Sequence, residues 1–158
     1  MHILSIYCDM HTKIRKNLLK AYVWSVALYG SETWTIGKTE EKRLLAFETR
    51  CYRRLFRINW TEHITNEEMY RRVGETKSFL KTLKTRRAKL IGHILRQNSL
   101  LSRIIEGAIE GNNSRGRPPL DYISQIVRDM DCRSYCELKR KAEKRQEWRI
   151  AANQPLGC

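Results

Sequence analysis

The chain has 158 residues, of which 41% are hydrophobic, so it is long enough for one ordinary domain with a core of its own. Lysine and arginine number 31 against 17 aspartates and glutamates, which gives a formal net charge of +14. This composition excludes a disordered tail, a collagen-like fibre and a disulfide-stapled mini-protein. It points to a polyanionic partner, with nucleic acid ahead of an anionic membrane surface.

The positive charge is concentrated in the middle of the chain. Residues 38–100 hold sixteen basic and seven acidic side chains, and so account for +9 of the total. We expect this region to bind the polyanion. For any single residue, the alternative is that the Lys or Arg side chain merely solvates a helix face.

The first predicted helix runs from Thr12 to Tyr29. Thr12 is a suitable N-cap, and Gly30 permits the turn that ends the helix. Apolar residues recur between these ends at helical spacing. They are Ile14, Leu18, Ala21 or Tyr22, Ser25 or Val26, and Tyr29.

A second helix is predicted from Thr39 to Ile58, because two glutamates follow Thr39 and suit the positive end of a helix dipole. One stripe of this helix is apolar and consists of Leu44, Phe47, Cys51, Leu55 and Ile58. A basic stripe beside it lies within about 60° of arc, which suits contact with successive phosphates. It consists of Arg43, Arg50, Arg54 and Arg57, which we call the arginine ridge.

Two further helices follow before residue 100. The sequence Thr65-Asn66-Glu67-Glu68 is a capping box, so a short helix begins there and ends near Gly74. A longer basic helix is predicted from Ser78 to Arg96, in which Gly92 indicates close packing against another helix. Its positive side chains are further candidate phosphate contacts. They are Lys81, Lys84, Arg86, Arg87 and Lys89.

The pattern changes after Ser99. Residues 103–111 alternate loosely and include two glycines, which predicts a short extended segment. Residues 111–119 form a linker that is rich in Gly, Asn and Pro. Beyond the linker, two more helices are predicted, from Asp121 to Met130 and from Tyr135 to Ala152.

The linker contains one short match to a known DNA-reading motif. Arg115-Gly116-Arg117-Pro118 resembles the core of an AT-hook, which places arginines in the narrow minor groove of A·T-rich DNA. Arg115 and Arg117 are therefore candidate nucleic-acid contacts of a second kind. The alternative is a basic turn between two elements.

The sequence gives little support for catalysis. Two-metal nucleotidyl transfer needs clustered carboxylates, and the four aspartates of the chain include no adjacent pair. Cys132 and Cys136 have the spacing of metal ligands, but a zinc site needs two further ligands. We expect no catalytic residue, no bound metal and no cofactor in this chain.

Two tryptophans near the arginine ridge have two interpretations. Trp34 and Trp60 fall just outside predicted helices, where each either stacks on a nucleic-acid base or caps the core. We favour the core for both.

The cysteine pattern and the apolar stretches indicate a location. The five cysteines form no regular framework, and the first residues lack a secretory signal. The longest apolar stretch, from Ala21 to Leu28, is far short of a membrane span. We expect an intracellular protein, nuclear or cytoplasmic, with reduced thiols, no membrane partner and no small-molecule substrate.

Five blocks of sequence cover nearly the whole chain. They are residues 22–35 (YVWSVALYGSETWT), 47–68 (FETRCYRRLFRINWTEHITNEE), 86–96 (RRAKLIGHILR), 106–123 (EGAIEGNNSRGRPPLDYI) and 141–155 (KAEKRQEWRIAANQP). Together and in this order, they resemble the C-terminal region of LINE-type, non-LTR retrotransposon reverse transcriptases, the jockey-like RNA-directed DNA polymerases.

The resemblance implies that the chain corresponds to the end of a much longer enzyme, with Met1 inside an ancestral reading frame. The family's endonuclease, fingers and palm would lie upstream, and its Mg²⁺ belongs to the palm, whose aromatic-x-Asp-Asp turn is absent from this sequence. Residues from about Lys13 to Arg57 would correspond to the thumb, which in reverse transcriptases grips the template-primer duplex. The isolated chain is therefore expected to bind RNA or DNA duplex and to lack polymerase activity. The palm domain, which it lacks, would be its protein partner.

The sequence as a whole predicts a mainly α fold. Residues 1–99 would form a thumb-like helical region, residues 100–119 an extended segment and basic linker, and residues 120–158 a C-terminal helical tail. The favoured function is nucleic-acid binding by a reverse-transcriptase remnant without its palm. Two alternatives stay open: a stand-alone AT-hook-like chromatin binder, and a non-functional translated fragment whose apolar surface is exposed where a palm is missing.

Overall fold

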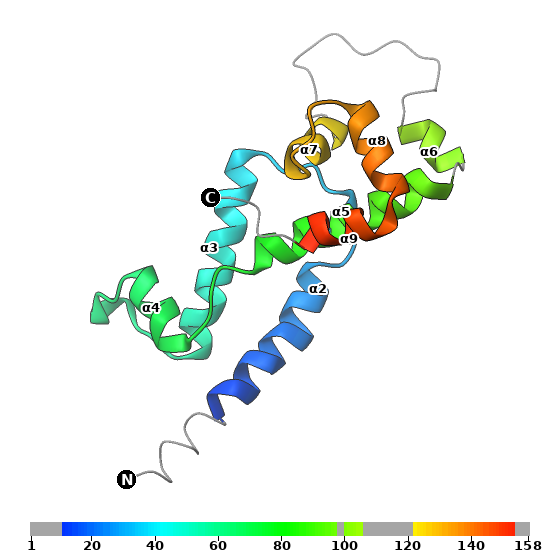
Figure 1. The fold of residues 1–158 in the computed structure, drawn as a ribbon. Helices are drawn as coiled ribbons and strands as arrows, with labels where there is room; N and C mark the ends of the chain where they lie inside the picture. The colour runs from blue at the N-terminus through cyan, green and yellow to red at the C-terminus, as the bar shows by residue number, and fades with distance from the viewer. Residues whose placement is uncertain (1–10, 98–99, 106–121, 154–158) are drawn as a thin grey trace. The chain divides into compact units, whose positions relative to one another are not determined.

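The computed structural model describes residues 11–97, 100–105 and 122–153 of the chain (Figure 1). These ranges are mainly helical and contain no strand, which confirms the predicted fold class. No helix within them is both long and apolar enough to cross a membrane. The chain divides into two compact units: unit 1 comprises residues 1–29 and 38–80, and unit 2 comprises residues 30–37 and 81–158. The boundaries predicted at residues 99 and 119 lie outside the described ranges.

The first helix of unit 1 has its buried face set by a π-helical turn. Residues 11–18 are α-helical, η1 (Leu19–Trp24) is π-helical, and α2 (Ser25–Ala27) follows directly. In an uninterrupted α-helix, Leu19 and Trp24 would lie about 140° apart around the axis. The wider π turn brings both side chains to the buried face.

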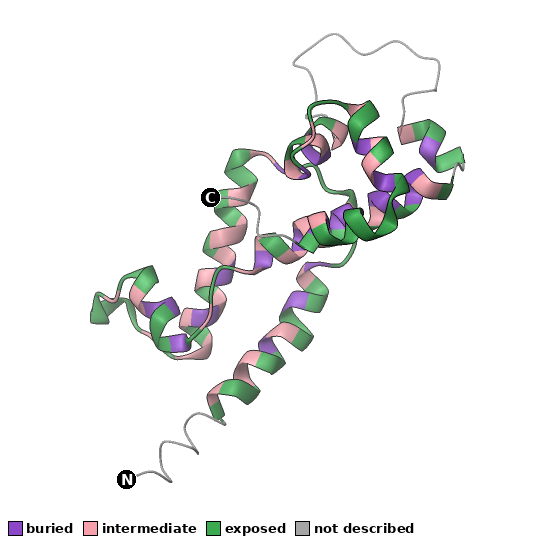
Figure 2. Cartoon of the chain, in the orientation of Figure 1, coloured by how far each residue is buried: buried purple, intermediate pink, exposed green. Residues whose placement is uncertain are grey.

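The apolar residues that predict this helix lie on its exposed side instead. Their exposed fractions range from 48% to 86%. Figure 2 colours exposed positions of this helix green. These apolar residues are Ile14, Leu18, Tyr22, Val26 and Tyr29, which we call the apolar stripe. A plain helical period cannot separate this stripe from the buried one, because the π turn changes the period inside the helix.

The rest of unit 1 consists of three helical elements and the first two residues of a fourth. They are α3 (Lys38–Leu55), η3 (Trp60–Glu62), α4 (Asn66–Val73) and the start of α5 (Phe79–Gln97). Edge-to-face aromatic contacts connect α3 and α5 to the first helix. The Trp24 ring of η1 lies 5.4 Å from the Phe79 ring and 6.5 Å from the Tyr52 ring, measured between ring centroids.

The ends of α4 lie where the sequence predicts them. The Thr65 hydroxyl accepts a hydrogen bond from the backbone N–H of Glu68 at 3.2 Å. Gly74 takes a left-handed conformation with φ of 63° and closes the helix. The predicted N-cap and C-cap are confirmed, but the capping box is seen only in its Thr65 half, because the Glu68 carboxylate pairs with Arg71 and Arg72.

Glu48 is a charged residue in the centre of unit 1. It has no exposed surface, and its Oε1 accepts hydrogen bonds from the backbone N–H groups of Ser78 at 2.9 Å and Phe79 at 3.1 Å. N–H groups at the start of a helix have no partner within it, so Glu48 on α3 caps α5. Burial raises the pKa of the Glu48 carboxyl above its usual value, although the two backbone hydrogen bonds act in the opposite direction.

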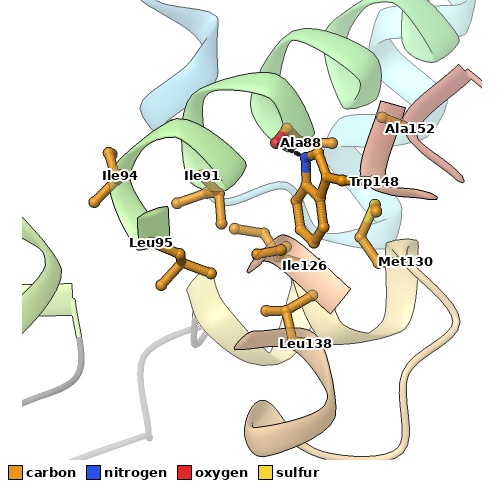
Figure 3. Close-up of a cluster of buried hydrophobic side chains, with 10 residues drawn as sticks. Ala88, Ile91, Ile94, Leu95, Ile126, Met130, Leu138, Trp148 and Ala152 are labelled. Atoms are coloured by element: carbon orange, nitrogen blue, oxygen red, sulfur yellow. Dashed lines mark hydrogen bonds between the residues drawn. The ribbon is translucent and has the colours of Figure 1, made fainter. Parts of the chain in front are cut away.

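Unit 2 is built around the indole of Trp148. It contains the rest of α5, α6 (Leu100–Ile105), α7 (Tyr122–Asp129), α8 (Tyr135–Glu143) and α9 (Arg145–Asn153). Figure 3 shows the Trp148 ring among Ile91, Ile126 and Leu138, with its Nε1 donating to the Ala88 carbonyl at 2.9 Å. This hydrogen bond satisfies the one polar atom of a buried tryptophan.

Two predicted elements of unit 2 differ from the structure. The extended prediction is wrong for residues 103–105, which belong to α6, whereas residues 106–111 lie outside the described ranges. The helix predicted from Tyr135 to Ala152 is broken at Lys144. In a continuous helix Trp148 would point about 120° away from Ala142, and the break allows both to join one core.

Gly92 confirms the predicted close approach between helices. A Cβ at this position of α5 would lie 2.5 Å from Cε2 and 2.7 Å from Cδ1 of Trp148, and closer still to Nε1. No real Cβ contact is this short, so the Trp148 ring occupies the space that any other residue would need.

We predict that Gly92→Ala lowers the free energy of unfolding by about 1–3 kcal/mol, because the added methyl group overpacks the core. Helix propensity alone favours alanine by about 1 kcal/mol, so the sign of the change tests the contact. Urea unfolding followed by circular dichroism measures it. In a Trp148→Phe background the cost should shrink, and an unchanged or raised stability of Gly92→Ala would contradict the contact.

We predict a second stability effect, at Glu48. A carboxyl whose pKa is raised in the folded state binds its proton more tightly there, so its contribution to stability falls as the pH rises through the range above the unfolded value. Urea unfolding from pH 4 to pH 8, compared between the natural chain and Glu48→Gln, isolates this contribution. The stability of the natural chain relative to the variant should decrease with rising pH, and a relative increase would show that the pKa is lowered.

Candidate nucleic-acid interface

Three members of the arginine ridge lie on the surface of α3. Arg43, Arg50 and Arg54 are exposed, and none has an acidic partner among the residues that the structure describes. The helix rises about 16 Å from the first to the last of them. Their guanidinium groups therefore offer a row of positive charges to an external anion.

Arg57 follows the helix instead of continuing it. The helix α3 ends at Leu55, and Arg57 has a left-handed backbone with φ of 54°. Its N–H donates to the Arg54 carbonyl at 3.2 Å, and the N–H of Ile58 donates to the Arg53 carbonyl at 2.9 Å. These two bonds form a Schellman motif, in which glycine usually takes the position of Arg57.

The loop after Arg57 is fixed by side chains at both of its ends. Arg53 donates from Nη2 to the Ile64 carbonyl and to Asn66 Oδ1, the latter at 3.0 Å. Within the loop, the N–H of Asn59 donates to Glu62 Oε1 at 2.9 Å. Arg53 thus connects the end of α3 to the start of α4 and serves the fold.

Trp60 lies in this loop and is 82% exposed. The expectation that it caps the core is therefore wrong. Trp34, the second tryptophan with two interpretations, is 41% exposed and belongs to unit 2. A tryptophan side chain is amphipathic and suits either the surface or the core. The local sequence has no hydrophobic period that would distinguish these two positions.

The basic residues of α5 divide into surface and interior positions. Lys81 and Lys89 are exposed, and neither has an acidic partner within the described ranges. Arg86 is also exposed and lies 3.8 Å from Glu32 Oε1. Lys84 is half-buried, with its Nζ 3.1 Å from Asp129 Oδ1. These residues of α5 belong to unit 2, whereas the arginine ridge belongs to unit 1.

The prediction that Arg87 contacts phosphate is wrong. Its side chain is 2% exposed, and its Nη2 lies 2.9 Å from Asp129 Oδ2. Its Nη1 donates to Gln125 Oε1 at 3.2 Å and to the Trp34 carbonyl at 3.1 Å. The guanidinium is therefore committed to the interior of unit 2, and a phosphate outside the chain cannot reach it.

The remaining candidates of the sequence lie outside the described ranges or form no site. Arg115 and Arg117 lie outside them, so the structure does not describe the AT-hook-like motif. Cys132 is half-buried and Cys136 exposed, and burial raises the pKa of the Cys132 thiol. Within the described residues, His, Cys, Asp and Glu form no group of three or more that suits a metal.

We predict that Arg57→Gly raises the free energy of unfolding by about 0.5–1 kcal/mol. A side chain in the left-handed region costs about 1–2 kcal/mol, and the greater freedom of glycine in the unfolded chain offsets part of the gain. Arg54→Gly is the matched control inside α3 and should lower stability by about 1 kcal/mol. Urea unfolding of both variants provides the measurement, and a loss of stability in Arg57→Gly would contradict the cap geometry.

Comparison with known proteins leaves the family unassigned. No family model matches the chain, and neither a curated protein nor a solved structure matches it. The resemblance to non-LTR reverse transcriptases therefore depends on the five sequence blocks alone.

Proposed function

We propose that this chain binds nucleic-acid duplex through its phosphate backbone, as the thumb-like C-terminal remnant of a LINE-type RNA-directed DNA polymerase without its palm. The observation that carries the proposal is the arginine ridge. Three exposed arginines follow one side of α3 and a fourth follows its cap, without acidic partners among the described residues. Guanidinium groups bind phosphate oxygens with two parallel hydrogen bonds, and this contact does not depend on base sequence.

The exposed lysines of α5 extend the proposal to unit 2. Lys81 and Lys89 supply point charges for additional phosphates. Arg87 has no part in binding, since its charge is paired inside the unit. The affinity should therefore follow the surface charges and not the formal net charge of the sequence.

The apolar stripe supports the part of the proposal that concerns the missing palm. Five large apolar side chains, each between 48% and 86% exposed, follow one side of the first helix. Contiguous apolar surface of this kind marks places where another protein surface packs. In the family that the five sequence blocks resemble, the palm would be the surface that packs against such a face.

The proposal assigns binding without polymerisation. Primer extension with Mg²⁺ and purified chain should therefore give no incorporation, and incorporation would overturn this part. Loss of DNA binding in Arg117→Ala, with selective competition by A·T-rich duplex, would assign the binding to the linker instead of the ridge.

We predict that replacing Arg43, Arg50 and Arg54 together by glutamine weakens duplex binding at least about tenfold at low salt. The slope of log affinity against log salt should decrease by about 0.9 for each phosphate contact that is lost. Fluorescence anisotropy with a labelled duplex at several salt concentrations measures both quantities.

The matched control replaces three exposed arginines of α8 and α9, Arg140, Arg145 and Arg149, by glutamine. It makes the same change in net charge. This control should retain most of the affinity and the salt slope. Equal weakening by both triple variants would show that total charge, and not the ridge, determines binding.

A further inference from the structure

Trp60 lies outside the aromatic core of its unit. The Trp24 and Tyr52 rings contact one another in the core, whereas Trp60 is 82% exposed. The residues next to it in the sequence, Asn59, Thr61 and Glu62, are exposed and polar. A lone ring among polar residues is unlike the contiguous apolar surface that another protein would cover.

The backbone that carries Trp60 is held in one conformation by hydrogen bonds. The Schellman motif precedes it, and Arg53 connects the helix before the loop to Asn66 after it. Directly after Trp60, the N–H of His63 donates to the Trp60 carbonyl at 3.2 Å. A ring on a fixed backbone loses little conformational entropy when a ligand contacts it, so the loop is preorganised.

Two positive side chains shortly precede Trp60 in the sequence. Arg57 is exposed three residues before Trp60, and Arg54 is exposed on the last turn of α3. Against these two arginines stands one acid, Glu62, which is exposed and whose Oε1 accepts a hydrogen bond from the N–H of Asn59. A ligand for this surface therefore combines negative charge with a flat apolar face, which are the two properties of a nucleotide with an unpaired base.

We infer that Trp60 stacks on an unpaired base of the nucleic acid whose backbone the arginine ridge holds. The inference rests on the proposed function and deepens it. The preferred ligand becomes a duplex with a single-stranded extension, because a base within a duplex already stacks on its neighbours. Stacking on an indole accepts every base, so the extension needs no particular sequence.

The experiment compares two hairpin duplexes of equal stem length, each closed by a non-nucleotide linker so that the loop holds no unpaired base. One is blunt, and the other has an extension of about five unpaired nucleotides, a length within the footprint of single-strand binders. Binding of the natural chain, Trp60→Ala, Trp60→Phe and Trp60→Leu is measured by anisotropy with both hairpins. Thermal unfolding of each variant serves as the folding control. The natural chain should prefer the extended hairpin by about tenfold, as one stacked base provides.

Trp60→Ala and Trp60→Leu should remove this preference and leave blunt-hairpin binding unchanged, whereas Trp60→Phe should keep part of it. Tyr29→Ala, which removes an aromatic ring that is 86% exposed in the same unit, should keep all of it. Tryptophan emission should be quenched by the extended hairpin in the natural chain and much less in Trp60→Phe.

Three results from hairpin binding would overturn the inference: equal affinity for the two hairpins, full preference in Trp60→Leu, or an equal loss in Tyr29→Ala. Each of them leaves binding of the blunt hairpin through the ridge intact. Failure of the proposed function is a different result, in which the natural chain binds neither hairpin. Loss of self-association in Trp60→Ala without any change in hairpin binding would assign the ring to a protein contact and likewise overturn the inference.

Discussion

The buried guanidinium of Arg87 is the interaction on which unit 2 depends. A charge removed from water is tolerated only when it is paired and hydrogen-bonded, and here Asp129, Gln125 and the Trp34 carbonyl supply the partners. These partners come from α7 and from residues 30–37. The requirement to satisfy one side chain therefore brings three separate parts of the sequence together, and it explains why residues 30–37 belong to unit 2 although unit 1 lies on both sides of them in sequence.

The arginines of this chain have different tasks, which the net charge conceals. Arg87 organises an interior, Arg53 fixes a loop, and Arg57 occupies the position that ends a helix. The three arginines on α3 remain for an external anion. The long planar side chain suits every one of these tasks except that of Arg57, because it carries several donors in a fixed plane and also packs along its apolar stem. A basic composition therefore indicates a polyanion partner only after the internal uses have been identified.

The parts of the fold that follow from local chemistry are predictable from the sequence. Thr65 and Gly74 cap α4 where expected, and Gly92 marks a real close approach. The features that escape prediction depend on contacts between distant residues. No local rule shows that Arg87 turns inward while its neighbour Arg86 stays outside, since Asp129 and Gln125 lie about forty residues away along the chain.

The candidate site shows the same division. The helical period identifies the ridge on α3, but the left-handed Arg57 lacks the glycine that would announce the end of the helix. The π turn in the first helix has no sequence signature either, so the apolar stripe and the buried stripe exchange their expected places. Trp60 is ambiguous for another reason, because its exposure is decided by how the surrounding loop is fixed.

The position of residues 30–37 also has a consequence for the order of events during synthesis. The Ile36 N–H reaches its acceptor on Gln125 across 89 residues, and the Tyr122 hydroxyl donates to the Glu32 carbonyl across 90. A ribosome delivers the chain from its N-terminus, so this segment emerges long before α7 exists. Until then its buried polar groups have only water as a partner. Unit 1, which is complete once Leu80 has emerged, is able to form first, while the loop between its two parts waits for the helix that will hold it.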